Sequence, residues 1–212
     1  MRGTDLTIDN YADHIAKLTR TYTDALQYVA NEGPQPGALL VHSGTENHYY
    51  GDDRGVAFQA YGHLLHWISV NRPNQFIYFR PGERPIYFQI VPSDFWYEQD
   101  IDIAPEWLET LTIVRLSNLD ELSAQLKQYC VSDIAYIGGD DDIAASFGID
   151  KSLINPKKLL AYLDFSRAVK THYELEQLRA ANRLALLGHA AAKVRFLEGG
   201  SEYEIHMAFL QA

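Results

Sequence analysis

The chain of 212 residues has 47% hydrophobic and 22% charged residues, as is typical of a globular protein with a buried core. Its 28 acidic and 18 basic residues give a formal net charge of -10, which disfavours a nucleic-acid partner because phosphate would be repelled. No apolar run approaches the ~20 residues that cross a bilayer, so no membrane partner is expected.

The cysteine content bears on the compartment. The chain has one cysteine, Cys130, which has no intramolecular disulfide partner, and no charged-then-apolar leader opens the sequence. We therefore expect a cytoplasmic protein. Cys130 closes a predicted helix and is expected to be a small buried apolar residue.

The chain opens with a predicted amphipathic helix over residues 10–31, which Asp9 or Asn10 caps. Its apolar residues recur at steps of three and four, at Tyr11, Ile15, Leu18, Tyr22, Leu26 and Val29. Glycine and proline in residues 31–37 end it. Residues 38–42 form a short apolar run that predicts a strand buried on both faces, followed by a polar loop over 42–55.

Strand-like runs dominate the next segment. Residues 64–70, 75–80 and 85–91 are separated by turn residues and predict an antiparallel meander. A strand over 112–116 leads into a helix over 120–129, capped by Asn118 with Glu121 three residues later. A strand over 133–139 follows, and the strand–helix–strand order predicts a crossover unit. The first ~165 residues are therefore predicted to form a mixed α/β domain.

Helices dominate the remainder. Asn155-Pro156 opens a helix to about Ala168. Thr171 and Glu174 form a capping box for a helix that ends at Gly199-Gly200, and Ser201 and Glu204 form a second capping box. The long helix has two apolar faces. One is a stripe of small residues, made of Ala181, Ala185, Gly188 and Ala192, and the other is made of Leu184, Leu187, Ala191 and Val194. Little sequence follows to bury both faces, so we expect a domain over 1–166 and, over 167–212, the truncated start of a second.

Several polar groups are candidates for chemistry. His63 and His66 lie near Asp52 and Asp53, but the predicted strand points the two rings to opposite faces, which disfavours a metal site. Asp140-Asp141-Asp142 is typical of an acidic helix start, since the spacing of a calcium loop is missing. His42, Ser43 and Asp53 include the residue types of a nucleophilic triad without its strained turn. Asp52-Asp53 is either solvated or facing a ligand.

The sequence resembles the prolidases of the bacterial Xaa-Pro dipeptidase branch, together with the organophosphorus acid anhydrolases similar to them. The resemblance runs along the whole chain and is most specific in its last helices. It rests on residues 11–18, His42-Ser43-Gly44, Asp52-Asp53, Phe58, Trp67, residues 93–96, residues 135–138, residues 154–156, Lys170-Thr171, Glu174-Leu175, Leu178-Arg179, Ala181, Gly188-His189, Ala191-Ala192 and residues 200–205.

This resemblance implies an amino-terminal α/β domain followed by the first helices of a pita-bread α+β domain. It implies hydrolysis of Xaa-Pro dipeptides by a hydroxide activated by two divalent metals, usually Mn²⁺. The family's metal ligands and catalytic residues fall beyond the helix that begins at Ser201, so none is assigned here, and this chain alone is expected to bind no metal and to be inactive.

The resemblance also implies a homodimer in which this domain closes the partner's active site. Asp53 then matches a substrate-binding aspartate that holds the ammonium group of the dipeptide. Near that region the sequence departs from the family at Tyr61-Gly62-His63 and in a shorter loop before Phe58. The alternatives are an organophosphorus acid anhydrolase, an aminopeptidase P-like enzyme, or a non-catalytic domain for dimerisation or binding.

Overall fold

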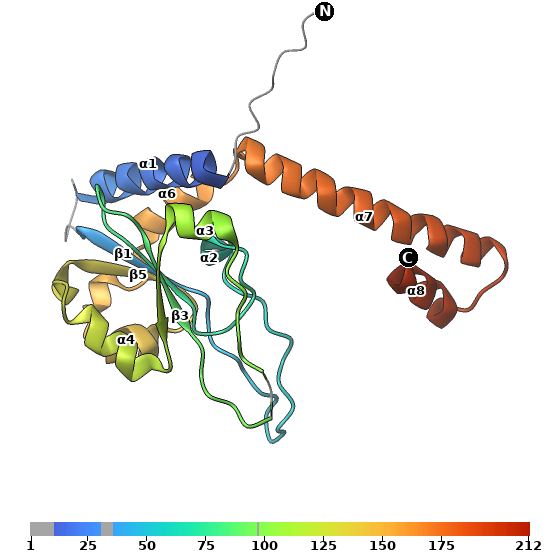
Figure 1. Cartoon of the computed structure of the whole chain (residues 1–212), viewed down its shortest axis with the longest axis horizontal. Helices are drawn as coiled ribbons and strands as arrows, with labels where there is room; N and C mark the ends of the chain where they lie inside the picture. Colours follow the sequence, from blue (N-terminus) through green and yellow to red (C-terminus); the bar gives the residue numbers. More distant parts are fainter. Residues whose placement is uncertain (1–10, 31–35, 97) are drawn as a thin grey trace, which may run out of the picture. The chain divides into compact units, whose positions relative to one another are not determined.

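The computed structural model describes residues 11–30, 36–96 and 98–212. The described chain forms two compact units, residues 11–168 and residues 169–212. The first unit is a mixed sheet with helices on both faces, and the second is a pair of helices (Figure 1). The predicted α/β class is confirmed. The predicted helix cap at Asp9 or Asn10 lies outside the described residues.

Five strands form the sheet, in the order β4-β3-β2-β1-β5. β2 is antiparallel to both β1 and β3, while β5 is parallel to β1 and β4 is parallel to β3. Four strands therefore end at the same edge, where β2 begins. The strands are β1 (Ala38–His42), β2 (Phe76–Phe79), β3 (Ile86–Ile90), β4 (Thr112–Leu116) and β5 (Ile134–Ile137).

One face of the sheet is covered by α1 (Tyr11–Ala30), α2 (Gly62–Trp67), α3 (Pro105–Thr110) and α6 (Lys157–Ser166). The predicted apolar stripe of α1 faces inward, and the Tyr22 ring contacts the rings of Trp67 and Phe79. The opposite face is covered by α4 (Leu119–Leu126) and α5 (Asp141–Ser146), where Leu122 and Leu126 belong to the same buried cluster as Phe88. Two short 3-10 helices, Val131–Asp133 and Lys151–Leu153, flank β5.

The predicted strand over residues 64–70 is wrong, because residues Gly62–Trp67 form the helix α2. The apolar run is too short for its period to separate a strand from a single buried helical turn. Leu64 and Trp67, three residues apart, are both fully buried, as one helix face requires. Helix α3 was not predicted; it buries Trp107, with Pro105 in its first turn.

The predicted strand–helix–strand crossover is confirmed, because α4 links β4 to β5 and the two strands run parallel in one sheet, although they lie at its opposite edges. The parallel neighbours are β3 with β4 and β1 with β5, both pairs set by packing between segments distant in sequence. Cys130 is exposed rather than buried, because α4 ends at Leu126 and Cys130 lies in the following loop.

The second unit consists of α7 (His172–Leu197) and α8 (Glu202–Gln211). Both predicted capping boxes are present in full, at Thr171 with Glu174 and at Ser201 with Glu204. Gly199 has φ 81°, the left-handed conformation that ends a helix. The Phe209 ring of α8 packs on Gly188 of α7. Among the described helices, none is long and apolar enough to cross a membrane.

Candidate functional site

The polar residues of the first unit gather at the edge where β1, β3, β4 and β5 end. Two long loops leave from this edge, residues 43–61 after β1 and residues 91–96 and 98–104 after β3 (Figure 1). In an open α/β sheet, the crevice outside the carboxyl ends of the strands is the usual place for a ligand. This edge is therefore the candidate functional region of the first unit.

His42 ends β1 and fixes the root of the first loop. Its Nδ1 is hydrogen-bonded to the Tyr136 hydroxyl at 2.6 Å, and its ring stacks on Phe76 with centroids 4.2 Å apart. Burial lowers the pKa of His42 to about 4, although Asn74 and Asp140 act in the opposite direction. The imidazole is therefore neutral at pH 7, and it ties β1 to β5.

Ser43 is a structural residue of the same edge rather than a nucleophile. Its Oγ accepts the backbone N–H of Gln75 at 2.9 Å. The Gln75 side chain accepts the Tyr87 hydroxyl at 2.7 Å and donates to the carbonyl of Ile90 at 2.9 Å. No bond between His42 and Ser43 is present among the described residues, so the triad considered from sequence is not assembled.

Asp53 lies on a projecting hairpin within the first loop. The hairpin is closed by backbone bonds from Val56 to Asn47 at 2.8 Å and from Tyr49 to Arg54 at 3.1 Å. Asp52 Oδ1 accepts the Arg54 N–H at 3.0 Å, so this carboxylate shapes the turn. Asp53 is exposed, and its carboxylate has no hydrogen-bond or ion-pair partner in the part of the chain that the structure describes.

A cavity of about 330 Å³ lies at the root of this hairpin, lined by Thr45, Phe58, Tyr61 and neighbouring residues. Thr45 donates to Asp140 Oδ2 at 3.1 Å, which links the first loop to the start of α5. Asp140 also caps α5 by accepting the N–H groups of Asp142 and Ile143. The predicted acidic helix start is therefore confirmed.

Large aromatic side chains are exposed on both loops. Tyr50 on the hairpin is fully exposed, and Phe95 and Trp96 on the second loop are 89% and 79% exposed. The rings of Phe95 and Trp96 pack edge to face at 4.9 Å. Exposed aromatic residues beside a polar edge are typical of a surface that another molecule covers.

His63 and Asp53, considered together from sequence as metal ligands, are not brought together. His63 on α2 is buried, with Nε2 3.0 Å from Asp164 Oδ1 and Nδ1 3.4 Å from the Tyr22 hydroxyl. Burial and then the nearby Arg167 lower the pKa of His63 to about 4, against the opposing effect of Asp164. Both ring nitrogens are therefore used within the fold. The sequence placed His63 beside a predicted strand, whereas the structure places it in α2 with its side chain in the core.

The fold is shared with solved aminopeptidases P. The structure titled aminopeptidase P from E. coli with the inhibitor Pro-Leu has a TM-score of 0.55 and 19% identity, covering 91% of this chain and 49% of that chain. Proline aminopeptidase P II from Yersinia pestis has a TM-score of 0.57 and 16% identity, with the same coverage. At this identity the comparison defines a class of fold.

The family follows from sequence. The family model described as Xaa-Pro dipeptidase, N-terminal domain, matches residues 9–165, so the chain belongs to that family and the predicted resemblance is confirmed. Xaa-Pro dipeptidases of Serratia proteamaculans and Photorhabdus laumondii are 34% and 32% identical over 205 and 203 residues. These alignments cover 95% of this chain and 44% and 45% of the relatives, so the chain spans less than half of their length.

Proposed function

We propose that this chain is part of an Xaa-Pro dipeptidase, which hydrolyses the peptide bond before a C-terminal proline in dipeptides. The observation that carries the proposal is the family match along residues 9–165. The expected compartment is the cytoplasm, in keeping with the single cysteine of the sequence.

The cofactor of the proposed enzyme is a pair of divalent metal ions, taken to be Mn²⁺. The candidate residues considered from sequence, and Glu204 at the start of α8, do not fit such a centre. Asp140 caps a helix, His63 is hydrogen-bonded through both nitrogens, and Asp53 lies on an exposed hairpin. Glu204 is held by the Ser201 N–H and by Arg195, which lower its pKa to about 2. We therefore assign no metal ligand among these residues and place the metals in the length of the relatives that this chain does not span.

Asp53 is proposed as a substrate-binding residue that acts across a homodimer interface. Its exposed, unpartnered carboxylate suits the α-ammonium group of a dipeptide in the partner's active site. The exposed aromatic residues Tyr50, Phe95 and Trp96 support the dimer, because they lie on the two loops of the same edge and would be covered there.

The test uses the natural gene product that carries residues 1–212, loaded with Mn²⁺, and steady-state hydrolysis of Ala-Pro. Asp53→Asn is expected to raise KM about tenfold or more with a smaller change in kcat, because a hydrogen bond to a charged group contributes about 1.5–3 kcal/mol. Asp52→Asn is the matched control, because asparagine retains the oxygen that accepts the Arg54 N–H. An unchanged KM for Asp53→Asn would remove the proposed role.

The isolated chain of 212 residues is expected to release no proline from Ala-Pro above a Mn²⁺-only blank, and turnover above that blank would contradict our placement of the metals. An aminopeptidase P-like activity is a second candidate, favoured by the names of the solved structures that share the fold. Preference of the gene product for a longer Xaa-Pro peptide over Ala-Pro would select it. Preference for a fluorophosphonate would indicate an organophosphorus acid anhydrolase, and no hydrolysis would indicate a binding domain.

A further inference from the structure

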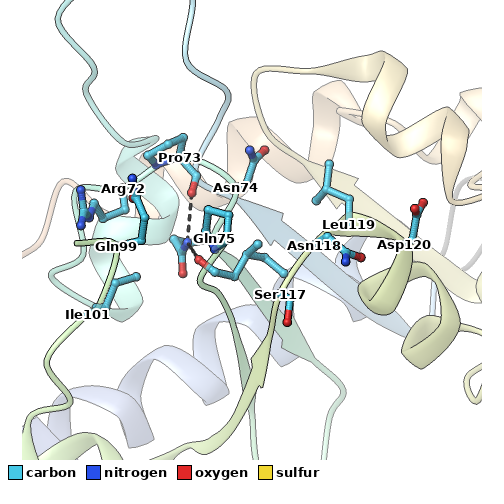
Figure 2. Close-up of a pocket in the computed structure, with 12 residues that line it drawn as sticks. Arg72, Pro73, Asn74, Gln75, Gln99, Ile101, Ser117, Asn118, Leu119 and Asp120 are labelled. Carbon is cyan, nitrogen blue, oxygen red and sulfur yellow. Dashed lines mark hydrogen bonds between the residues drawn. The ribbon is translucent and has the colours of Figure 1, made fainter. Parts of the chain in front are cut away.

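The loop that carries Asp53 stands on a base that the sheet edge holds at both of its ends. The carbonyl of Gly44 accepts the Asn74 N–H at 2.9 Å, and the Ala60 N–H donates to Asn71 Oδ1 at 2.7 Å. Asn74 also lines a cavity of about 410 Å³ at the ends of β3 and β4, which Figure 2 shows. Because the base is part of the fold, the placement of Asp53 is decided by the hairpin that continues from it.

The turn of this hairpin is closed by bonds to both neighbours of Asp53. The Tyr49 N–H donates to the Arg54 carbonyl at 3.1 Å, and the Tyr49 carbonyl accepts the Asp52 N–H at 3.1 Å. Asp52 Oδ1 accepts the Arg54 N–H at 3.0 Å, and Gly51 supplies the left-handed conformation of the turn with φ 70°. Asp53 is therefore held through the residues on either side of it, while its carboxylate stays unbonded among the described residues.

Arg54 brings a competing cation next to that carboxylate. It is the one lysine or arginine of residues 43–61, and it directly follows Asp53. A guanidinium pairs readily with a carboxylate, and such a pair would occupy the oxygens that the ammonium group of a ligand needs. Within residues 11–30, 36–96 and 98–212, however, Arg54 forms no ion pair. Its guanidinium carbon lies instead 5.0 Å from the centre of the Tyr49 ring, within the ~6 Å at which a cation and a ring attract each other.

We propose that Tyr49 is a positioning residue, which holds Arg54 on its ring and so keeps this cation off Asp53. The proposal rests on the substrate-binding role of Asp53 proposed above. With Arg54 held on the ring, the Asp53 carboxylate remains available to the α-ammonium group of a dipeptide in the partner's active site. The ring contact also joins residues 49 and 54, the two ends of the turn, so one contact serves both the shape of the turn and its charge.

The kinetic test measures KM and kcat for Ala-Pro with the Mn²⁺-loaded gene product that carries residues 1–212. Tyr49→Leu should raise KM about threefold with a smaller change in kcat, because the released Arg54 then pairs with Asp53 for part of the time and an exposed ion pair is weak. Tyr49→Phe keeps the ring and should keep KM low. Adding Arg54→Gln to Tyr49→Leu should restore KM, because the competing cation is gone. A tyrosine that only shaped the turn would not be rescued by this second change.

Nuclear magnetic resonance of the 212-residue chain tests the ring contact without any activity. The side-chain protons of Arg54 should lie upfield of their usual shifts, because the face of the Tyr49 ring shields them. The upfield shift should persist in Tyr49→Phe and disappear in Tyr49→Leu. Tyr50→Leu is the matched control, since Tyr50 is the fully exposed neighbouring tyrosine, and it should leave the Arg54 shifts unchanged.

Three results would overturn the proposal. The first is an unchanged KM for Tyr49→Leu in an enzyme whose KM is raised by Asp53→Asn. The second is a raised KM that Arg54→Gln does not restore, and the third is a set of ordinary shifts for the Arg54 side chain in the parent chain. Failure of the proposed function gives a different pattern: Asp53→Asn leaves KM unchanged while the Arg54 protons remain upfield, and the positioning role then falls together with the role of Asp53.

Discussion

The sheet unit and the helical pair differ greatly in the fraction of their apolar side chains that is buried. In the sheet unit every residue of β1, β2 and β5 is buried. In α7, by contrast, Gly188 is the buried residue among 26, and Leu184, Leu186 and Leu187 are each more than half exposed. The sheet unit is therefore stabilised by a packed core, whereas α7 and α8 depend on their caps and on a few contacts between them, those of Phe209 with Gly188 and His189 and that of Arg195 with Glu204. This difference predicts how each unit responds to substitution.

The largest expected effect comes from removing the same side chain in each unit. Leu40→Ala in β1 should lower the free energy of unfolding of the sheet unit by about 3 kcal/mol, because it leaves a cavity in a fully buried layer. Leu187→Ala in α7, where the side chain is 57% exposed, should change stability by no more than about 0.5 kcal/mol. Urea unfolding followed by tryptophan fluorescence and circular dichroism measures both. Equal losses would show that α7 is as tightly packed as β1.

The next effect is a loss of sheet-unit stability in mild acid. Both His42 and His63 have a folded-state pKa lowered from 6.5 to about 4, so the unfolded chain binds protons first and stability falls as pH drops from 6.5 toward 4. Between pH 7 and pH 5 each histidine should cost about 2 kcal/mol. The three tryptophans all lie in residues 11–168, so their fluorescence reports this unit. His42→Gln should reduce the pH dependence, while the exposed His48→Gln should not; identical slopes would contradict the assignment.

A smaller effect tests the contact between α7 and α8. A Cβ at position 188 would lie 2.8 Å from the Phe209 ring and 3.0 Å from its backbone oxygen. Gly188→Leu should therefore overpack this contact and weaken it by about 1–3 kcal/mol. Faster hydrogen exchange of the α8 amides is the expected readout. Ala190→Leu adds the same side chain at an exposed position of α7 and should leave exchange unchanged. Equal α8 exchange rates in the two variants would reject the contact.

The smallest effect concerns the cap of α8. Ser201 accepts the Glu204 N–H through its side chain, and Glu204 accepts the Ser201 N–H at 2.8 Å. Ser201→Ala should cost about 1 kcal/mol of helix stability, because one end of the capping box is lost. Ser201→Asp should restore most of it, since aspartate is also a favourable cap. Circular dichroism and exchange at residues 202–205 compare the two, and no difference between them would show that the cap is unimportant.

The candidate site was predictable in its residue types more than in its arrangement. Asp52-Asp53 was singled out from sequence as a pair of acidic residues in the loop after a buried strand, and the substrate-binding role of Asp53, which the family resemblance implies, stays a prediction. The cavity at the ends of β3 and β4 was not predicted, because its lining brings together residues such as Asn74 and Ser117, which are far apart in the chain. The only signal available from sequence was the position of each residue just beside a predicted strand. The pairing of those strands was needed to bring them to one cavity.

The sequence by itself determined the features that depend on neighbours within a few residues. Three such features are the apolar stripe of α1, the capping boxes at Thr171 and Ser201, and the glycine that ends α7. Tertiary structure alone decided the helical state of residues 62–67, the separation of β4 from β5 and the burial of His63. The physical reason is that a short apolar segment gains its free energy from whatever surface it packs against, and that surface is supplied by distant parts of the chain.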